Sequence, residues 1–116
     1  LVAGLGIGFA ASVLAIRPEV SSVTVVEISP DVIKLVAPHI REPHKIRIVN
    51  ADAKDFLANH KAGLFDFAFY DVWIEQTVEV LADVVGPLRA LSAGKVVHTP
   101  TCWNEDVMRG DMRGKL

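Results

Sequence analysis

The sequence predicts an α/β protein with a doubly wound, mainly parallel sheet that carries helices on both faces. Apolar, β-branched segments alternate with helix-compatible segments, a pattern typical of parallel strands joined by helical crossovers. The length of 116 residues and a hydrophobic content of 51% suit one globular domain. Glycines or acidic residues follow four of the predicted strands, at the sheet edge where such folds bind their ligands.

The first half of the chain predicts three strands, each followed by a helix. Residues 1–3 end a buried strand, and residues 9–16 form an apolar helix that stops before Pro18. Residues 23–28 read as a strand buried on both faces. Ser29 begins the next helix as its N-cap, with Pro30 in the first helical position, and Pro38 ends it. A third strand over 45–49 leads through Asp52 to a short helix.

The second half predicts two more strands and one long helix between them. Residues 65–70 form a strand that places Asp71 at its carboxyl end. Apolar residues then recur at helical spacing, with a kink or break at Gly86 and Pro87. Gly94 caps that helix, and residues 95–99 form the fifth strand. From Cys102 onward the chain is polar and shows no strand pattern, and Glu105, Asp106 and Arg109 suggest a solvated helical face.

Composition narrows the functional classes. The net charge is −2 with acidic and basic residues interspersed, so no basic stripe indicates a nucleic-acid partner. The uncharged stretch 1–16 is too short to span a bilayer and contains three glycines. A single cysteine, Cys102, suits a reducing compartment, and we expect a cytoplasmic protein. His98 and Cys102 lie four residues apart, but no further ligands complete a metal site.

We expect residues 1–116 to form a single domain that is a fragment, truncated at both ends. No internal repeat or linker divides the chain. The first residue is Leu1, and the glycines follow at once, as if the chain began inside its first strand.

The glycine loop and an acidic residue one strand later predict a nucleoside-containing ligand. Gly4, Gly6 and Gly8 leave bare backbone for a ligand beside free N–H groups at a helix start, although a tight turn without a ligand gives the same pattern. Glu27 can accept hydrogen bonds from both ribose hydroxyls, and the alternative is an exposed charge at a strand end. Phe9 stands where a dinucleotide fingerprint needs a small residue and would crowd the helix–strand packing, which disfavours a dehydrogenase.

Five segments together resemble a class I S-adenosylmethionine-dependent methyltransferase, which has a Rossmann-like domain. Within this class the likeness is to spermidine-synthase-like proteins and related phage-encoded methyltransferase-like proteins. It runs from residue 1 to about residue 99, nearly the whole chain. The segments, in order, are VAGLGIG, VTVVEISPDVIKLV, IRIVNADAKDFL, FDFAFYDVW and LRALSAGKVV.

The resemblance implies S-adenosylmethionine as the cofactor and gives roles to individual residues. The three glycines would pass beneath its methionine part. Glu27 would hold the ribose and Ile28 would pack on the adenine. Asp52 would accept from the adenine amino group, while the N–H of Ala53 reaches a ring nitrogen. Asp52 suits an N-cap of the following helix equally well, and the two roles can coexist.

Three departures from the family pattern bear on the substrate and the assembly. Val2 stands where many members carry an acid that meets the methionine amino group. The segment from Asp71 to Trp73 lacks the prolines of amino-methylating members, so adenine or glutamine methylation is disfavoured. Nothing after Thr99 predicts the terminal antiparallel hairpin, which leaves the fifth strand as an exposed edge. Truncation explains this, and a homo-oligomer formed through that edge is the alternative.

Asp71 is the candidate catalytic residue, because it ends the fourth strand beside the glycine loop. It would act as a base or orient the acceptor, and it also counts among the cofactor-binding residues; capping a helix is the alternative. Trp73 is a candidate wall of the acceptor pocket. The predicted activity is methyl transfer to an unidentified acceptor. The alternatives are an aminopropyltransferase-like enzyme, a catalytically incomplete S-adenosylmethionine-binding module and, more distantly, a dehydrogenase.

Overall fold

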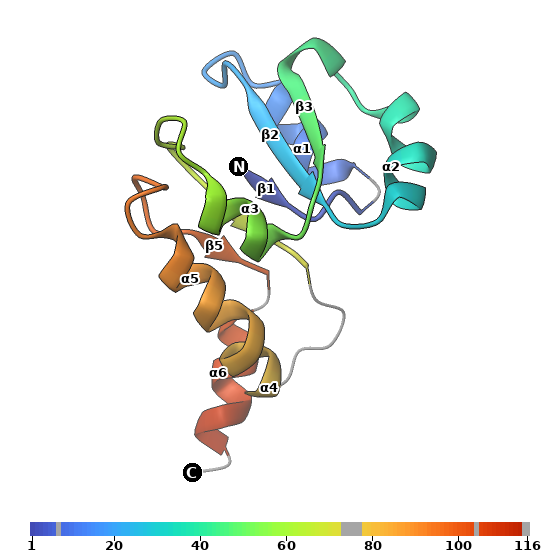
Figure 1. Cartoon of the computed structure of the whole chain (residues 1–116). Coiled ribbons are helices and arrows are strands. Elements are labelled where there is room, and N and C mark those ends of the chain that lie inside the picture. Colours follow the sequence, from blue (N-terminus) through green and yellow to red (C-terminus); the bar gives the residue numbers. More distant parts are fainter. Residues whose placement is uncertain (7, 73–77, 104, 115–116) are drawn as a thin grey trace.

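The fold is built on a five-stranded parallel sheet with the strand order β3-β2-β1-β4-β5 (Figure 1). The structure is a computed structural model and describes residues 1–6, 8–72, 78–103 and 105–114. The order reverses between β1 and β4, as the doubly wound prediction requires. The strands are β1 (Val2–Ala3), β2 (Val23–Glu27), β3 (Ile46–Asn50), β4 (Phe69–Tyr70) and β5 (Thr101–Cys102).

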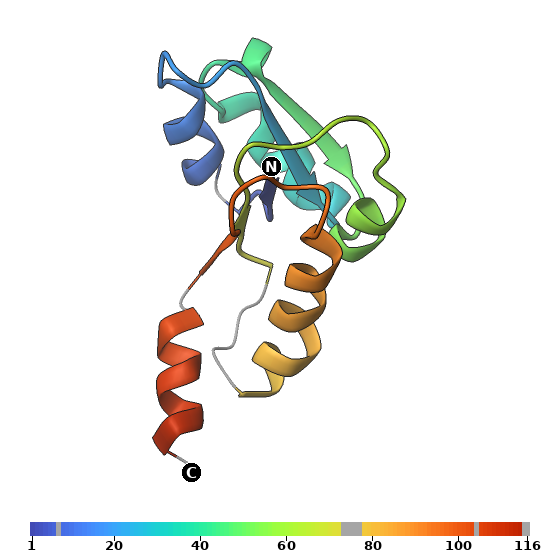
Figure 2. The ribbon, with the colours of Figure 1, turned by 90° about the vertical axis from the view of Figure 1, so that its left-hand side faces the viewer.

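The central strand β1 faces a different helix layer with each of its two residues, because side chains alternate along a strand. Val2 pairs with Val25 and Phe69 and packs into the core beneath the first two helices. Ala3 packs into the second core, on the other face. Figures 1 and 2 show the sheet between the first two helices on one face and the later helices on the other. Both predicted helix layers are confirmed.

The first layer contains α1 (Phe9–Ala15) and α2 (Pro30–Val36). Ala11 and Ala15, four residues apart, are the buried positions of α1, and their small side chains let the helix lie close to the sheet. Ser29 caps α2 as predicted, because its Oγ accepts a hydrogen bond from the N–H of Val32 at 3.3 Å. Two 3₁₀ turns follow, η1 (Ala37–His39) and η2 (Pro43–Lys45).

The second layer contains α3 (Ala53–Asn59), α4 (Val78–Val80), the π-helical segment η3 (Leu81–Val85) and α5 (Gly86–Ser92). Its core is closed by Leu57, Val85 and Leu88 together with Tyr70 of β4. The hydroxyl of Tyr70 lies 2.5 Å from Oγ of Ser92, which itself donates to the carbonyl oxygen of Leu88 at 2.7 Å. Because Ser92 has one proton to give, Tyr70 is the donor of the pair.

The expected break at Gly86 and Pro87 is a π-helical turn, and the helix continues through it. The N–H of Gly86 donates to the carbonyl oxygen of Leu81, five residues back. Pro87 has no N–H to give, so the carbonyl of Asp83 lacks its α-helical donor. Nζ of Lys54 donates to that oxygen from α3 at 3.5 Å. The proline therefore changes the hydrogen-bonding pattern instead of ending the helix.

The last two strands are shorter than predicted and the fifth is displaced along the chain. The expected strand 65–70 is reduced to β4, and 95–99 pairs only through a bridge from Phe65 to Val96. The ladder forms further on, where the N–H of Thr101 donates to the carbonyl oxygen of Ala68 and the N–H of Trp103 to that of Tyr70, both at 2.9 Å. The two residues of β4 that pair with β1 on one side pair with β5 on the other. The prediction of the fifth strand from the β-branched residues 96–97 was therefore wrong about its position.

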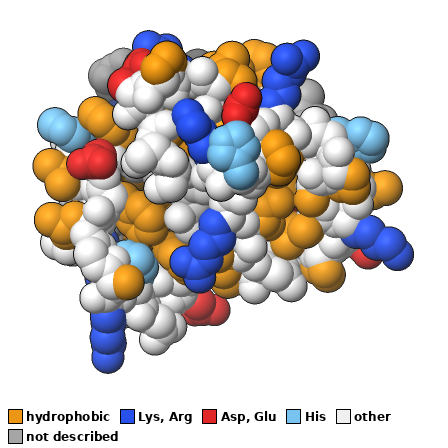
Figure 3. All heavy atoms as spheres, turned by 90° about the horizontal axis from the view of Figure 1, so that it is seen from above, with side chains coloured by type: hydrophobic (Ala, Val, Ile, Leu, Met, Phe, Trp, Pro, Cys, Tyr) orange, Lys and Arg blue, Asp and Glu red, His pale blue; other side chains and the backbone are white. Residues whose placement is uncertain are grey.

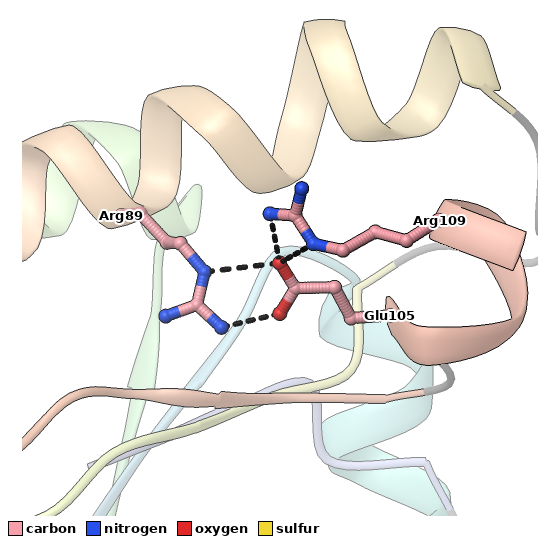
Figure 4. A network of polar contacts seen from close by, with 3 residues as sticks. All are labelled: Arg89, Glu105 and Arg109. Atoms are coloured by element: carbon pink, nitrogen blue, oxygen red, sulfur yellow. Dashed lines mark hydrogen bonds and ion pairs between the residues drawn. The ribbon is translucent and has the colours of Figure 1, made fainter. Parts of the chain in front are cut away.

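A final helix, α6 (Glu105–Gly114), lies beside α4 and η3. The prediction of a solvated face is wrong for Glu105, which is only 9% exposed. Its carboxylate accepts hydrogen bonds from Arg89 of α5 and from Arg109 one turn later, the latter at 3.0 Å from Nε (Figure 4). Glu105 therefore ties α6 to α5. In the described part of the chain, no helix is long and apolar enough to cross a bilayer.

Candidate functional site

A pocket of about 520 Å³ lies where the carboxyl ends of the strands meet. Residues that follow β1, β2, β3 and β4 all contribute to its lining, which is the convergence that the sequence predicted. The predicted site residues that line it are Gly4, Gly6, Glu27, Ile28, Asp52, Ala53 and Asp71. Gly8 is the predicted site residue that lies outside it.

Gly4 and Gly8 are bare for packing reasons. Gly4 has φ +98°, and a Cβ there would collide with the backbone carbonyl of Asp71. Gly8 is the N-cap of α1 with φ +83°, and a Cβ would come within 3.0 Å of Val36 and Ile40. The two glycines bring the loop against β4 and against α2. Both glycines therefore have a structural role in the turn, and Gly4 also lines the pocket.

Gly6 is different, because it combines a left-handed backbone with open space. Its φ is +52°, and no other residue that the structure describes, its two chain neighbours apart, has an atom within 4 Å of the position that a Cβ would take. It is exposed and lines the pocket. A ligand can therefore approach this residue without displacing protein atoms. Gly6 thus has the accessible backbone that the sequence predicted for all three glycines.

The argument that Phe9 crowds the helix–strand packing is wrong. The side chain of Phe9 is 71% exposed, because it begins α1 on the side away from the sheet. Close packing of α1 comes from Gly8, Ala11 and Ala15 instead. The steric objection to a dinucleotide therefore has no basis in the structure.

Glu27 is partly buried and accepts a hydrogen bond at each carboxylate oxygen, so it is not an exposed charge at a strand end. Its Oε1 accepts from the N–H of Leu5 and its Oε2 from the N–H of Ser29, both at 2.9 Å. Each carboxylate oxygen has a second lone pair, so the side chain keeps acceptor capacity toward the pocket that it lines. Glu27 thus connects the glycine loop with the start of α2.

Sequence reasoning missed Asn50, which fixes the backbone at the end of β2. Its Nδ2 donates to the carbonyl oxygens of Glu27 at 2.9 Å and Ile28 at 3.0 Å. Glu27 and Asn50 are also register partners in the parallel ladder. An asparagine directly after a β-branched run is a usual turn residue, so the sequence carried no signal for this tie.

Asp52 is the N-cap of α3, which confirms one of its two predicted roles. Its Oδ1 accepts from the N–H of Lys54 at 2.9 Å and of Asp55 at 3.2 Å. The cap leaves Oδ2 free of that duty, and it does not use the N–H of Ala53. Both groups are therefore compatible with a ligand in the pocket, which Asp52 and Ala53 line.

Asp71 lies directly after β4, next to the glycine loop. Its N–H donates to the carbonyl oxygen of Ala3 at 2.9 Å, which ties it to β1. The residue is exposed at the pocket, but neighbouring atoms remove some of the water around its carboxyl and raise the pKa above the usual 3.8. A carboxylate with a raised pKa is a better proton acceptor, as a general base requires.

The remaining pocket wall includes residues for which the sequence gave no site signal. Lys54 lies in the first turn of α3, and Val84 and Leu88 come from η3 and α5. They meet the strand ends only because α3 and α5 pack side by side on one face of the sheet. Trp73, the predicted acceptor wall, lies outside the described residues.

The opposite edge of the sheet has a mixed surface. The loops that lead into β2 and β3 lie at the top of Figure 1, and Figure 3 shows hydrophobic, charged and histidine side chains interspersed on that face. His98 stacks on Phe67 with 4.6 Å between ring centroids. Among the described residues, no three His, Cys, Asp or Glu side chains group as a metal site would require.

The comparison with protein-family models gives a match to the methyltransferase domain over residues 1–92. The chain belongs to the methyltransferase domain family. The matched range contains all four strand ends that line the pocket and ends with α5. No curated protein matches the chain. The family confirms the class I resemblance and S-adenosylmethionine-dependent methyl transfer as the activity, with the acceptor unidentified.

Family membership decides between the functions that the glycine loop left open. A methyltransferase domain of this kind typically binds S-adenosylmethionine, and the dehydrogenase reading falls away. Members of this class supply few reacting groups of their own, since the sulfonium already carries a good leaving group. The domain's main task is to align the acceptor with the methyl group.

Proposed function

We propose that the pocket at the strand ends binds S-adenosylmethionine and that Asp71 serves as the base in methyl transfer to a hydroxyl or amine acceptor. The observation that carries the proposal is that four strand ends of a methyltransferase domain line one pocket of about 520 Å³. Open space above Gly6, the uncapped N–H of Ala53 and spare lone pairs on Glu27 support the fit.

In this arrangement each part of the ligand has a matching group. Glu27 accepts from the ribose hydroxyls, and Ile28 packs on the adenine. Asp52 accepts from the adenine amino group through Oδ2, while Oδ1 continues to cap α3. The methionine part would lie over Gly6, at the place where a Cβ would project. When bound, the ligand supplies an electrophilic methyl group.

The chain's own contribution to the reaction centres on Asp71. Its carboxylate takes the proton from the attacking hydroxyl or amine, so that the acceptor is neutralised as it becomes methylated. The backbone of Asp71 is fixed, because its N–H is bound to the carbonyl oxygen of Ala3 and its own carbonyl lies against Gly4.

The finer assignment is to the branch of spermidine-synthase-like proteins, and it leaves aminopropyl transfer as the alternative reaction. Val2 is buried in β1. Because valine has no carboxylate, this position offers no acceptor to the amino group of the methionine part. In aminopropyl transfer, Asp71 would take a proton from the attacking amine in the same way. A module that binds the cofactor without an acceptor is the third possibility.

Isothermal titration calorimetry of one sample with four ligands tests the proposal. We expect binding of S-adenosylmethionine and S-adenosylhomocysteine and no binding of NAD. Preference for decarboxylated S-adenosylmethionine would favour aminopropyl transfer. Tight NAD binding without a response to any sulfonium or thioether ligand would overturn the proposal.

A further inference from the structure

One carboxylate contacts two loops of the pocket. Oε1 of Glu27 accepts from Leu5, in the glycine loop, and Oε2 accepts from Ser29, at the start of α2. The first contact spans 22 residues of chain and the second spans two. A residue that served only to bind a ligand would not need hydrogen bonds from these two backbone N–H groups.

The bond from Leu5 is the stronger constraint, because Leu5 is only 4% exposed. An unsatisfied N–H at a buried position costs far more than one at the surface. Its neighbours in the loop are also bound: Gly4 donates to the carbonyl of Val26 and Gly8 to the carbonyl of Leu5, each at 2.8 Å. The carboxylate therefore supplies the acceptor that completes this loop.

The bond from Ser29 fixes the other side of the pocket. Ser29 uses its Oγ to cap α2 through Val32, while its N–H is taken by Glu27. Asn50 holds the backbone of Glu27 itself by donating to its carbonyl oxygen at 2.9 Å. Glu27 is thus anchored on one side and supports two loops on the other.

We propose that Glu27 is a positioning residue that preforms the glycine loop before any ligand binds. The inference deepens the proposed function and rests on it for the identity of the ligand. Its two roles do not compete, because each carboxylate oxygen retains a lone pair after accepting one backbone N–H. A ribose diol then meets an acceptor whose direction is already set, which reduces the ordering cost of binding.

Hydrogen exchange in the ligand-free protein tests the positioning role. The variant Glu27→Gln keeps the size of the side chain but offers one oxygen where two N–H groups need acceptors. We expect the amide of Leu5 or Ser29 to exchange about tenfold faster than in the wild type. The control Asp31→Asn removes a nearby charge that contacts neither amide and should leave both rates unchanged. Unchanged rates in Glu27→Gln would overturn the proposal.

A second measurement requires no substitution and remains valid if the variant fails to fold. In the isotope-labelled wild type, a scalar coupling across the hydrogen bond should connect the amide nitrogen of Leu5 with the carboxyl carbon of Glu27. Loss of a detectable coupling while other loop hydrogen bonds show theirs would contradict the proposed contact.

Binding of a ligand without ribose hydroxyls separates positioning from direct contact. A 2′,3′-dideoxy analogue of S-adenosylhomocysteine has no ribose hydroxyls to donate to the carboxylate. If Glu27 only bound the ribose, its replacement would leave the affinity for this analogue unchanged. We expect Glu27→Gln still to weaken the analogue about fivefold, because the loop is less well formed. Equal affinity of wild type and variant would overturn the positioning role. Failure of the wild type to bind S-adenosylhomocysteine would instead overturn the proposed function, and the exchange experiment would still decide the inference.

Discussion

At the residue scale, the glycine loop owes its shape to contacts with three separate parts of the protein. Gly4 lies against the backbone of Asp71 and Gly8 against α2, whereas the described residues leave the space at Gly6 open. All three have positive φ angles, so an L-residue at any of them carries a strain of roughly 1–2 kcal/mol. What differs is the additional cost of finding room for a side chain.

Gly6→Ala should therefore separate folding from binding. We expect it to lower the free energy of unfolding by no more than about 2 kcal/mol, because only backbone strain is added. Its methyl group projects into the pocket, so the affinity for S-adenosylhomocysteine should fall at least about tenfold. Gly4→Ala is the matched contrast: the clash with the Asp71 carbonyl should cost more than about 3 kcal/mol. Urea denaturation and calorimetry measure both quantities. Equal stability losses would contradict the assignment.

Replacement of Asp71 tests its role as the base. Asp71→Asn retains the size of the side chain and removes the proton acceptor, so the rate of methyl transfer should fall by about 10²–10⁴. Affinity for S-adenosylhomocysteine should change little. A loss of affinity with an unchanged rate would move Asp71 to the cofactor side.

The pH profile gives a second readout at the same residue. Because burial raises the pKa of Asp71 above 3.8, its active, ionised form is lost as the pH falls through that raised value. We expect an acidic limb in the plot of kcat against pH for the wild type. This limb should be absent from the residual activity of Asp71→Asn. An identical limb in both proteins would assign the titration to another group.

At the element scale, α6 is attached to α5 through the ion pair of its buried Glu105 with Arg89, and Arg109 of α6 binds the same carboxylate. The side chain of Glu105 lies between Arg89 and Arg109 (Figure 4). Hydrogen bonding to Arg89, more than burial, sets the direction in which the pKa of Glu105 moves, and it is lowered below 4.5. Met108, fully buried one turn later, adds apolar contact to the same interface.

Glu105→Gln should destabilise the protein by about 2 kcal/mol near neutral pH, since it leaves two arginines beside a neutral amide. The lowered pKa means that the stabilisation is complete above the unfolded value of 4.5 and is lost as the pH falls through the folded value. The difference between variant and wild type should shrink in that acidic range. Asp106→Asn, an exposed neighbour, should stay within about 0.5 kcal/mol. Denaturation at several pH values measures this, and a pH-independent difference would contradict it.

At the scale of the whole molecule, the pocket joins both halves of the chain. Its lining draws on loops after β1, β2 and β3 and on Asp71, Val84 and Leu88 from the second half. A ligand that binds there contacts only the folded state, because these segments are far apart in the sequence. Binding should consequently stabilise the domain as a unit.

S-adenosylhomocysteine at a hundred times its dissociation constant should raise the free energy of unfolding by about 2.7 kcal/mol. Thermal denaturation at increasing ligand concentration measures the effect. NAD at the same concentrations is the control and should leave the midpoint unchanged. A shift with NAD alone, or no shift with either ligand, would contradict the proposed ligand.

Local sequence determined the elements whose signals lie within a few residues. Ser29 followed by Pro30 predicted the start of α2, and the β-branched run 23–28 predicted β2. The alternation of strand and helix segments was enough to predict the parallel sheet, because helical crossovers between strands permit only a few sheet topologies. It also predicted that Glu27, Asp52 and Asp71 lie at one sheet edge, since carboxyl ends of parallel strands point the same way.

Only the tertiary structure decided features that depend on residues far apart in the chain. The short β4 and displaced β5 follow from where β1 offers hydrogen bonds, and the burial of Glu105 follows from an arginine in another helix. The same holds for the separate reasons behind Gly4 and Gly6. A sequence shows where glycines leave the backbone without side chains. Only the packing shows whether protein atoms or a ligand can occupy that space, because those protein atoms belong to distant segments of the chain.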